Sequence, residues 1–214
     1  MKKFYFLFLL VVIMAGFLFY KQIIRARQIT VHRTTAPLIS NNTTFIADSG
    51  SQQTLGNPGA ALTVVEFVDI SCARCLTLHS AIKDFTTKHP QDIRLIWKDD
   101  PKPGVLSNYT LAHQAGYCAG QQEKFWQFLD AAISQRNDLS ETGLKKIAFS
   151  LNLDLDKFSQ CLNSPTTKQA IADSVQAADQ LGIRSLPAIF VNNKLINTDK
   201  EVNIEQMLGN FTAK

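Results

Sequence analysis

The sequence of 214 residues predicts an α/β domain from three observations. An apolar run rich in β-branched residues, 62–68, leads straight into a helical pattern at about 72–88, as a buried strand followed by a helix would. A long stretch, 106–181, has a helical pattern almost throughout. Two short apolar runs, 188–191 and 194–196, then have the composition of strands.

A C-x-x-C motif, Cys72 to Cys75, lies where the first strand gives way to the first helix. Asp69 and Ser71, both of residue types that cap helices, mark the boundary. From Cys72 to about Lys88 the pattern turns helical, with five positions that recur at spacings of three and four. These positions are Leu76, Leu78, His79, Ile82 and Phe85. Cys72 is therefore predicted at or near the helix N-terminus.

The position of Cys72 favours a reactive thiolate. Unpaired N–H groups and the helix dipole give the first turn of a helix a partial positive charge, which favours a thiolate over a thiol. Arg74 adds a fixed positive charge, and Cys75 lies one turn on, where it can close a disulfide with Cys72. We interpret the pair as a dithiol–disulfide exchange centre, in which Cys72 is the nucleophile and Cys75 the resolving thiol.

An inert structural disulfide and a zinc site are the alternatives for this pair. Structural zinc needs four ligands, and the sequence has no second C-x-x-C pair nearby. Covalent haem attachment requires a histidine directly after the second cysteine, where this chain has Leu76. We therefore predict no metal and no cofactor.

After one more strand, the middle of the chain is predicted to be helical. A strand candidate at 92–98 precedes a loop with two prolines. Turn-forming residues divide the stretch 106–181 into about five helices. The dividing residues are Gly120, Asn137 and Asp138, Asn152 to Asp154, and Asn163 to Pro165.

The end of the domain is predicted to be a hairpin and a helix. Asn192 and Asn193 join the two short strand candidates, and asparagine tolerates the positive φ that a tight hairpin turn requires. The last helix is expected over about 200–208, with Thr198 or Asp199 at its start.

The basic residues of the chain gather at its N-terminus. The formal net charge is +4, but residues 1–33 hold six of the 22 lysines and arginines and none of the 18 acids. The remainder therefore carries 16 basic and 18 acidic residues, a formal charge of −2. Such a balance argues against a nucleic-acid-binding protein.

Residues 1–20 are predicted to be a membrane segment, because the run 4–20 is apolar and uncharged. Two lysines precede the run and no A-x-A cleavage pattern follows it, which favours an uncleaved single-pass anchor over a cleaved secretory signal. Basic residues on both sides leave its orientation open. Residues 21–54 show little periodicity and are predicted to be a tether, with a short strand around 45–47.

Two stretches of the sequence resemble a known family. The stretch 55–67, LGNPGAALTVVEF, followed by the C-x-x-C motif, looks like the start of the catalytic domain in bacterial DsbA-family thiol:disulfide oxidoreductases. The stretch 185–192, SLPAIFVN, is similar to the family's cis-proline segment. The resemblance covers roughly 54–214. It implies a thioredoxin fold over 55–214 with a helical insertion at about 105–182.

The resemblance also implies roles for three more residues. Glu66 lies in an apolar strand, where burying a carboxylate is costly without a partner. The resemblance implies that it lies beneath the active site and assists proton transfer to the resolving thiol; a carboxylate on a solvated face is the alternative. It also implies a cis peptide bond between Leu186 and Pro187 facing the motif, an ordinary proline at a strand start being the alternative. Leu186, Pro187 and Arg74 are the predicted substrate-binding residues.

Two cysteines and one histidine complete the set of candidates. Cys118 and Cys161 lie in the helical stretch, and a leftover pair is usually bonded in an oxidising compartment. We therefore predict a structural disulfide, two buried free cysteines being the alternative. His79 lies one turn past Cys75 and is expected to be exposed or at the edge of the core.

These features predict a thiol:disulfide oxidoreductase that forms disulfide bonds in extracytoplasmic proteins. The resemblance implies protein substrates with cysteine thiols, and re-oxidation by a membrane quinone-linked partner that is DsbB-like or VKOR-like. We predict a single-pass protein of the cytoplasmic membrane with its catalytic domain on the periplasmic side. If the N-terminal segment is cleaved, the protein is instead secreted to the periplasm.

The dipeptide between the two cysteines leaves the direction of exchange open. Ala73-Arg74 differs from the Pro-His or Pro-Tyr pair of strongly oxidising family members, and this dipeptide tunes the redox potential. A disulfide reductase or isomerase of the same fold is therefore an alternative. From other classes, the alternatives are a copper-handling thioredoxin-fold protein that uses Cys72 and Cys75 as ligands, and a binding module with an inert C-x-x-C.

Overall fold

The chain forms two compact units, Met1–Leu38 and Ile39–Lys214, and all the helices and strands discussed here belong to the second. Among the residues that the computed structural model describes, no helix is both long and apolar enough to cross a membrane. The predicted anchor, except for Met14, and the strand expected at 45–47 lie outside those residues. The described residues are 14, 21, 53–102, 107–198 and 202–212.

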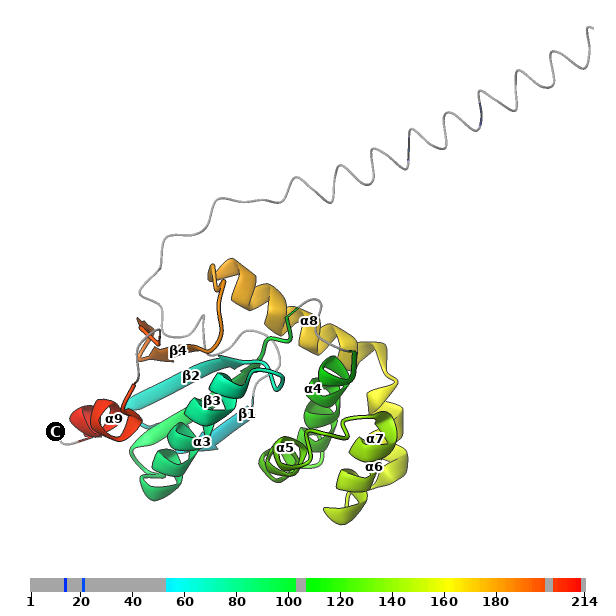
Figure 1. Cartoon of the computed structure of the whole chain (residues 1–214), viewed down its shortest axis with the longest axis horizontal. Coiled ribbons are helices and arrows are strands. Elements are labelled where there is room, and N and C mark those ends of the chain that lie inside the picture. Colours follow the sequence, from blue (N-terminus) through cyan, green and yellow to red (C-terminus); the bar gives the residue numbers. More distant parts are fainter. Residues whose placement is uncertain (1–13, 15–20, 22–52, 103–106, 199–201, 213–214) are drawn as a thin grey trace, which may run out of the picture. The chain divides into compact units, whose positions relative to one another are not determined.

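Five strands form one mixed sheet in the part of the chain that the structure describes (Figure 1). The strand order is β1-β3-β2-β4-β5. Strands β2 and β3 run parallel, and the other neighbouring pairs are antiparallel. The strands are β1 (Gln53–Gly56), β2 (Leu62–Val68), β3 (Ile93–Asp99), β4 (Ala188–Val191) and β5 (Lys194–Ile196).

Helix α3 follows β2 directly, and α9 follows the sheet at the end of the domain. Helices α4 to α8 stand between β3 and β4 in the sequence, and in Figure 1 α4 to α7 gather beside the sheet while α8 leads back to it. The helices are α3 (Ala73–Lys88), α4 (Ser107–Gly120), α5 (Phe125–Ser134), α6 (Glu141–Ser150), α7 (Leu155–Leu162), α8 (Pro165–Gln180) and α9 (Ile204–Thr212). The prediction of about five helices in this stretch is confirmed.

Alternating side chains give β2 two buried faces. On one face Val64 joins a core cluster with Leu95 of β3 and Ile82 of α3. On the other face Phe67 joins a cluster with Ala178 of α8. The strand is therefore covered by helices on both sides, as its largely apolar run predicts.

Capping residues at the predicted breaks separate the inserted helices. Asp154 accepts the backbone N–H groups of Asp156 and Lys157 at the start of α7. Ser164 accepts the N–H of Thr166 at the start of α8, whose first residue is Pro165. Both caps satisfy N–H groups that have no partner within their own helix.

A disulfide between Cys118 and Cys161 links α4 to α7, with the two Cα atoms 5.7 Å apart. Cys118 is buried in the main core cluster, and Cys161 packs against the same cluster. Thr167 of α8 donates its hydroxyl to the carbonyl of Cys161 at 2.6 Å. The bond therefore lies where three helices of the insertion meet.

The hairpin between β4 and β5 has the predicted turn. Asn192 and Asn193 have φ values of 45° and 68°, in the left-handed region. The Asn192 side chain also accepts the backbone N–H of Thr63 at 2.8 Å, which fastens the hairpin to β2.

Two elements differ from the sequence prediction. Strand β1 is not predicted, because its four residues show no apolar alternation; it forms at the sheet edge by pairing with β3. The predicted start of the last helix is wrong, since α9 begins later, at Ile204. Asn203 supplies the cap by accepting the N–H of Gln206, whereas Thr198 donates its hydroxyl to the carbonyl of Pro187.

Candidate active site

Cys72 is the N-cap of α3. Its backbone is extended, with φ −83° and ψ 104°, and its Sγ accepts the N–H of Cys75 at 3.1 Å. The N–H of Leu76 donates to the carbonyl of Cys72 at 3.2 Å and begins the helical ladder. The predicted position of Cys72 at the helix N-terminus is confirmed.

Cys72 and Cys75 form a disulfide, with Cα atoms 5.2 Å apart, but the two sulfurs are not equally accessible. Cys75 is fully buried, whereas Cys72 is half-buried and is followed by the exposed residues Ala73 and Arg74. An incoming thiolate can therefore reach Cys72 more readily than Cys75.

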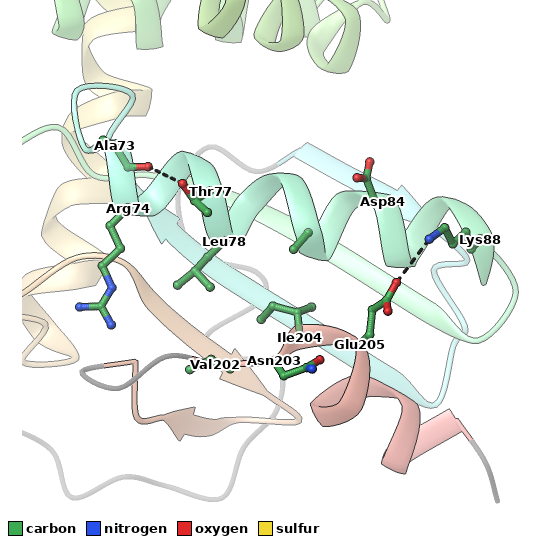
Figure 2. Close-up of a pocket in the computed structure, with 11 residues that line it drawn as sticks. Ala73, Arg74, Thr77, Leu78, Asp84, Lys88, Val202, Asn203, Ile204 and Glu205 are labelled. Atoms are coloured by element: carbon green, nitrogen blue, oxygen red, sulfur yellow. Dashed lines mark hydrogen bonds and ion pairs between the residues drawn. The ribbon is translucent and has the colours of Figure 1, made fainter.

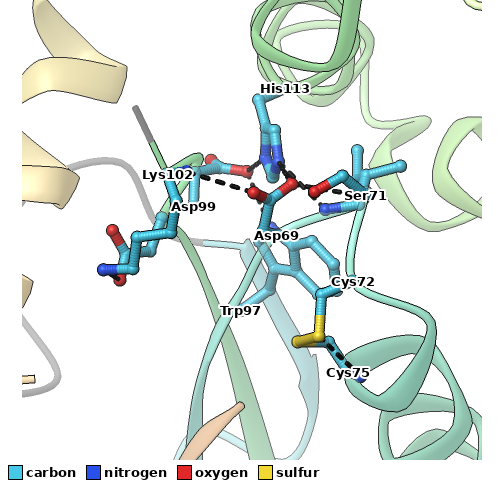
Figure 3. Close-up of polar contacts among 10 residues, drawn as sticks. Asp69, Ser71, Cys72, Cys75, Trp97, Asp99, Lys102 and His113 are labelled. Atoms are coloured by element: carbon cyan, nitrogen blue, oxygen red, sulfur yellow. Dashed lines mark hydrogen bonds and ion pairs between the residues drawn. A yellow bond between two sulfur atoms is a disulfide. The ribbon is translucent and has the colours of Figure 1, made fainter. Parts of the chain in front are cut away.

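The loop that precedes Cys72 is held by Asp69 (Figure 3). The carbonyl of Asp69 accepts the N–H of Cys72 at 3.0 Å. Its carboxylate accepts the N–H of Ser71 at 2.8 Å and the N–H of Lys102 at 3.1 Å. Asp69 thus joins the redox-motif loop to the segment that leaves β3.

His113 of α4 extends this network into the inserted helices (Figure 3). Its Nδ1 lies 2.7 Å from Asp99 Oδ1, an oxygen that also accepts the indole N–H of Trp97 at 2.8 Å. Its Nε2 lies 3.2 Å from the backbone nitrogen of Ile70 and 3.6 Å from Asp69 Oδ1. One buried imidazole therefore contacts both the loop before Cys72 and the end of β3.

The network is charged although it is buried. Burial disfavours the charged imidazolium of His113, but Asp69 and Asp99 outweigh that effect and raise the pKa of the ring to about 9. Burial also disfavours the ionised carboxylate of Asp69, but hydrogen bonds from His113 and from backbone N–H groups lower its pKa to about 2. At neutral pH an imidazolium therefore faces an ionised carboxylate.

The two neighbours of His113 Nε2 require different protonation states. The Ile70 N–H, at 3.2 Å, can donate only to a bare nitrogen, whereas Asp69, at 3.6 Å, accepts only from a protonated one. Because two carboxylates raise the pKa of the ring, we assign the Asp69 contact to neutral pH and the Ile70 bond to the neutral ring.

Glu66 and His79 form a second buried polar pair. Glu66 lies two residues after Val64 on β2, so both side chains are on the face that packs against α3. There, Glu66 Oε1 lies 2.5 Å from His79 Nδ1. Only 1% of the Glu66 side chain and 2% of the His79 side chain is exposed. The expectation that His79 is exposed or at the core edge is therefore wrong: the residue lies on the buried face of α3, with its ring stacked on Trp126 and edge-on to Trp97.

The peptide bond between Leu186 and Pro187 is cis and lies at the same edge of the sheet as the C-x-x-C motif. Phe67 of β2 pairs with Ala188 of β4, so the chain enters β4 where β2 leads to Cys72. Pro187 is buried, and Leu186 packs against the same core cluster as Cys72. The strand pairing therefore brings the backbone of Leu186 and Pro187 to the end of the sheet at which Cys72 and Cys75 lie.

A groove of about 660 Å³ lies between α3 and the start of α9, with Ala73 and Arg74 in its lining (Figure 2). Its walls include the aliphatic side chains of Leu78, Val202 and Ile204. Arg74 lines its end nearest Cys72, and an ion pair between Lys88 and Glu205 bridges the other end. The groove therefore offers an apolar surface that begins at the redox motif.

Sequence reasoning did not single out Asp99 or His113. Register pairs Val68 with Asp99, so Asp69 and Asp99 leave neighbouring parallel strands at one edge. An acid at the end of each predicted strand was a usable signal for that pair. A histidine within a helical pattern carries no such signal, because its partners come from distant segments.

A protein-family model described as thioredoxin matches residues 48–209. The chain belongs to the thioredoxin family. The match spans the sheet, the C-x-x-C motif and the inserted helices of this thioredoxin-family protein, so the predicted fold is confirmed.

Solved structures share the fold of this thioredoxin-family chain. A thioredoxin-like oxidoreductase from Silicibacter pomeroyi DSS-3 has a TM-score of 0.67 at 27% identity, covering 78% of this chain and 94% of its own. The thiol-disulfide exchange protein alpha-DsbA2 from Wolbachia pipientis has a TM-score of 0.67 at 24% identity, with coverage of 81% and 92%. BdbD from Bacillus subtilis has a TM-score of 0.64 at 21% identity, with coverage of 78% and 96%. The predicted resemblance to DsbA-family proteins is confirmed at the level of the fold.

Curated relatives are much longer proteins. The Na(+)/H(+) antiporter NhaA 3 of Salinispora tropica is 30% identical over 135 residues, which is 63% of this chain. The Na(+)/H(+) antiporter NhaA 1 of Salinispora arenicola is 31% identical over 135 residues, again 63% of this chain. The chain spans about a fifth (21%) of the length of each, so the similarity concerns one part of those proteins.

Proposed function

We propose that the protein is a thiol:disulfide oxidoreductase that forms disulfide bonds in other proteins by exchange at Cys72 and Cys75. The observation that carries the proposal is the disulfide at the N-terminus of α3, in which one sulfur is half-buried and the other is fully buried. This asymmetry suits a disulfide that a partner opens from one side. The Cys118–Cys161 disulfide has a similar difference in burial, but both of its cysteines lie near the C-terminal end of a helix, so the N-cap position of Cys72 is what distinguishes the reactive pair.

The proposed reaction begins when a substrate thiolate attacks Cys72 Sγ. The bond between Cys72 and Cys75 breaks, and its electron pair leaves with Cys75, so the substrate and Cys72 form a mixed disulfide. A second substrate thiolate then attacks the substrate sulfur of that bond, and Cys72 leaves as a thiolate. The substrate has lost two electrons, and the protein holds them as a dithiol.

Local charge supports Cys72 as the leaving thiolate. The backbone N–H of Cys75 donates to its Sγ at the positive end of the α3 dipole, and the first turn contains no acid. Arg74 adds a positive charge within the motif. The ionised carboxylate of Asp69, three residues before Cys72, disfavours a thiolate there. His113 offsets that negative charge while its ring is protonated.

In this reaction we assign proton transfer at Cys75 to Glu66. A buried thiolate is costly, so the sulfur that leaves needs a proton. Glu66 is buried, faces α3 from β2, and contacts His79, which lies four residues after the equally buried Cys75. These observations support the role that the family resemblance implies for this residue.

Protein substrates would bind along the edge of the sheet where Cys72 and Pro187 meet. The backbone of Leu186 is proposed to pair with an extended substrate segment, as a strand pairs with an exposed edge. The groove beside Arg74 would hold apolar side chains of the same segment. Proteins with cysteine thiols near apolar residues are therefore the proposed substrate class.

We further propose that residues 1–20 anchor the protein in the cytoplasmic membrane, with the domain on the periplasmic side, or direct its secretion there if cleaved. A structure with this fold is described as a periplasmic thioredoxin-like protein from Salmonella enterica serovar Typhimurium; it has a TM-score of 0.63 at 18% identity and covers 83% of this chain. Re-oxidation by a DsbB-like or VKOR-like quinone-linked partner belongs to the same proposal.

The test is the reduction potential of the full chain, equilibrated with glutathione and read by mass spectrometry at Cys72 and Cys75. Strong disulfide oxidants lie near about −120 mV and thioredoxin near about −270 mV. We expect a value at the oxidising end. A value near that of thioredoxin would contradict the oxidase direction and favour the reductase alternative. Cys72→Ser, which should abolish exchange, is the control.

A further inference from the structure

The buried pair of Glu66 and His79 has an unsatisfied end. Its two side chains are almost inaccessible, and 2.5 Å separates Oε1 from Nδ1. Yet Nε2 of His79 is buried and has no hydrogen-bond partner among the residues that the structure describes. Leaving a buried polar atom unpaired is costly, so the presence of a histidine at this position suggests a chemical role.

His79 is close to the resolving cysteine along α3. Both side chains are on the buried face of the helix, and residues four apart on a helix have Cβ atoms about 5–6 Å from each other. Glu66 approaches the same face from β2. The Cys75 sulfur, the His79 imidazole and the Glu66 carboxyl group are therefore all buried on the side of α3 that faces the sheet.

We propose that His79 and Glu66 together store the proton that Cys75 takes up when the Cys72–Cys75 disulfide is reduced. The inference rests on the proposed function and deepens it, because it gives Glu66 a specific partner from α3. At 2.5 Å the oxygen and nitrogen share one hydrogen, whichever atom carries it. The free Nε2 offers a place for a second proton.

The proton balance of the step follows from these two positions. Before reduction the pair holds two protons, one between Nδ1 and Oε1 and one on Nε2, and is neutral overall. The substrate thiolate attacks Cys72, and the departing Cys75 sulfur takes one proton from the pair. Glu66 then remains as a carboxylate bound to neutral His79, so the charge of the incoming thiolate has moved to the pair. In the reverse reaction Cys75 returns the proton before it attacks Cys72.

The other side chains near His79 either do not titrate or can be distinguished from it in the experiment. Trp97 from β3 and Trp126 from α5 touch the ring and do not titrate. On α3 itself, Lys83 is paired with Asp130 of α5 at the surface. His113 lies on the far side of Trp97, with ring centroids 6.4 Å apart, and its pKa is about 9. A comparison of wild type with a variant at His79 therefore separates the pair from His113, which both proteins retain.

The experiment measures the rate at which dithiothreitol reduces the Cys72–Cys75 disulfide in the full chain, from pH 5 to 9, by stopped-flow tryptophan fluorescence. His79→Gln keeps a hydrogen-bonding amide beside Glu66 but removes the titrating ring. General acid–base assistance is typically worth about 10²–10⁴-fold. We expect His79→Gln to react at least about tenfold more slowly at pH 7 and to lose one step from the wild-type pH profile.

Two further variants make the result specific. His89→Gln makes the same change at the half-exposed C-cap of α3 and should react like the wild type. Glu66→Gln should reproduce the His79→Gln profile, and the double variant should be no slower than either, because the two residues act as one unit. Should His79→Gln not fold, Glu66→Gln carries the same test from the strand.

The outcomes separate the two proposals. A His79→Gln protein with a lower melting temperature but an unchanged rate and pH profile would overturn the inference and leave His79 as a packing residue. A wild-type protein with no reversible exchange at Cys72 would instead overturn the proposed function itself. Slower reduction together with a lost pH step, set against an unchanged His89→Gln, is the result that supports proton storage.

Discussion

His113 stabilises two neighbouring buried carboxylates, those of Asp69 and Asp99. Asp69 and Asp99 end neighbouring parallel strands, and two buried carboxylates so close together would repel each other. The imidazole between them contacts both and links them to α4. A single side chain from the insertion thereby fixes the loop that carries Cys72.

Protonation of His113 should make stability depend on pH. Its pKa rises from 6.5 to about 9 on folding. A raised folded pKa gives stabilisation that is complete below pH 6.5, falls as pH rises, and is gone above about pH 9. At about 1.4 kcal/mol per unit, the free energy of unfolding should drop by the order of 3 kcal/mol between pH 6 and pH 10.

Urea unfolding of wild type and His113→Gln at both pH values checks this prediction. The glutamine variant should be less stable at pH 6 and should show little of the decline, so the two proteins converge near pH 10. Because other groups titrate in the same range, the difference between the two proteins is the quantity to compare. Parallel declines would show that His113 is not the titrating group.

The N-terminus of α3 is the element on which the proposed chemistry depends. It combines an N-cap sulfur, backbone N–H groups and a first turn without acids. Arg74 is exposed in that turn, and Lys88 lies exposed at the opposite end of the same helix. The two cations form a matched pair for testing how much local charge matters at Cys72.

Arg74→Glu should make the Cys72 thiolate less stable. Reversing a charge about 8 Å from the thiolate in water changes the free energy of the thiolate by about 1 kcal/mol. This corresponds to a change of roughly fivefold in the thiol–thiolate equilibrium. The midpoint of thiolate formation, followed by absorbance at 240 nm in the reduced protein, should therefore move up by about 0.7 pH unit. Lys88→Glu should leave it in place. Equal shifts in both variants would indicate a general charge effect.

Elements with strong local signals were predictable from sequence. The apolar run of β2, the spacing along α3 and the Asn192-Asn193 turn each depend on nearby residues, and each appears as predicted. Strand β1 depends instead on pairing with β3, and its own residues carry no pattern. The start of α9 was misplaced because several residues before it could cap a helix, and Asn203 does so.

The polar interior of the site was harder to predict for the same reason. Glu66 was recognisable because a carboxylate stood in an apolar run. Its partner His79 occupied a buried helical position, yet the sequence does not show that a carboxylate faces it. His113 is far from Asp69 in sequence and contacts it only because α4 folds back over the strand ends. Such pairs are set by tertiary packing.

At the scale of the whole domain, the insertion and the sheet depend on each other. Trp97 of β3 and Phe125 of α5 belong to one core cluster that also holds Cys75. The Cys118–Cys161 disulfide ties α4, which carries His113, to α7. The insertion therefore both completes the core beneath the redox motif and positions one residue of its loop.

Removing the second disulfide should separate stability from chemistry. The bond closes a loop with a sequence separation of 43 residues. The chain-entropy argument gives such a closure about 4 kcal/mol at most. The double variant Cys118→Ala and Cys161→Ala should lower the free energy of unfolding by up to that amount, measured by circular dichroism in urea with Cys72–Cys75 kept oxidised.

Exchange at Cys72 should nevertheless persist in the folded double variant. Alanine suits the apolar surroundings of Cys118. Thr167 keeps its 2.6 Å hydrogen bond to the backbone carbonyl of Cys161 and loses only its longer contacts with the two sulfurs. The rate of reduction by dithiothreitol at 25 °C should therefore stay within about twofold of wild type. Substitutions far from a site usually act independently of it. A loss of exchange in protein that is still folded would show that the second disulfide acts on the site through α4 and His113, beyond holding the insertion together.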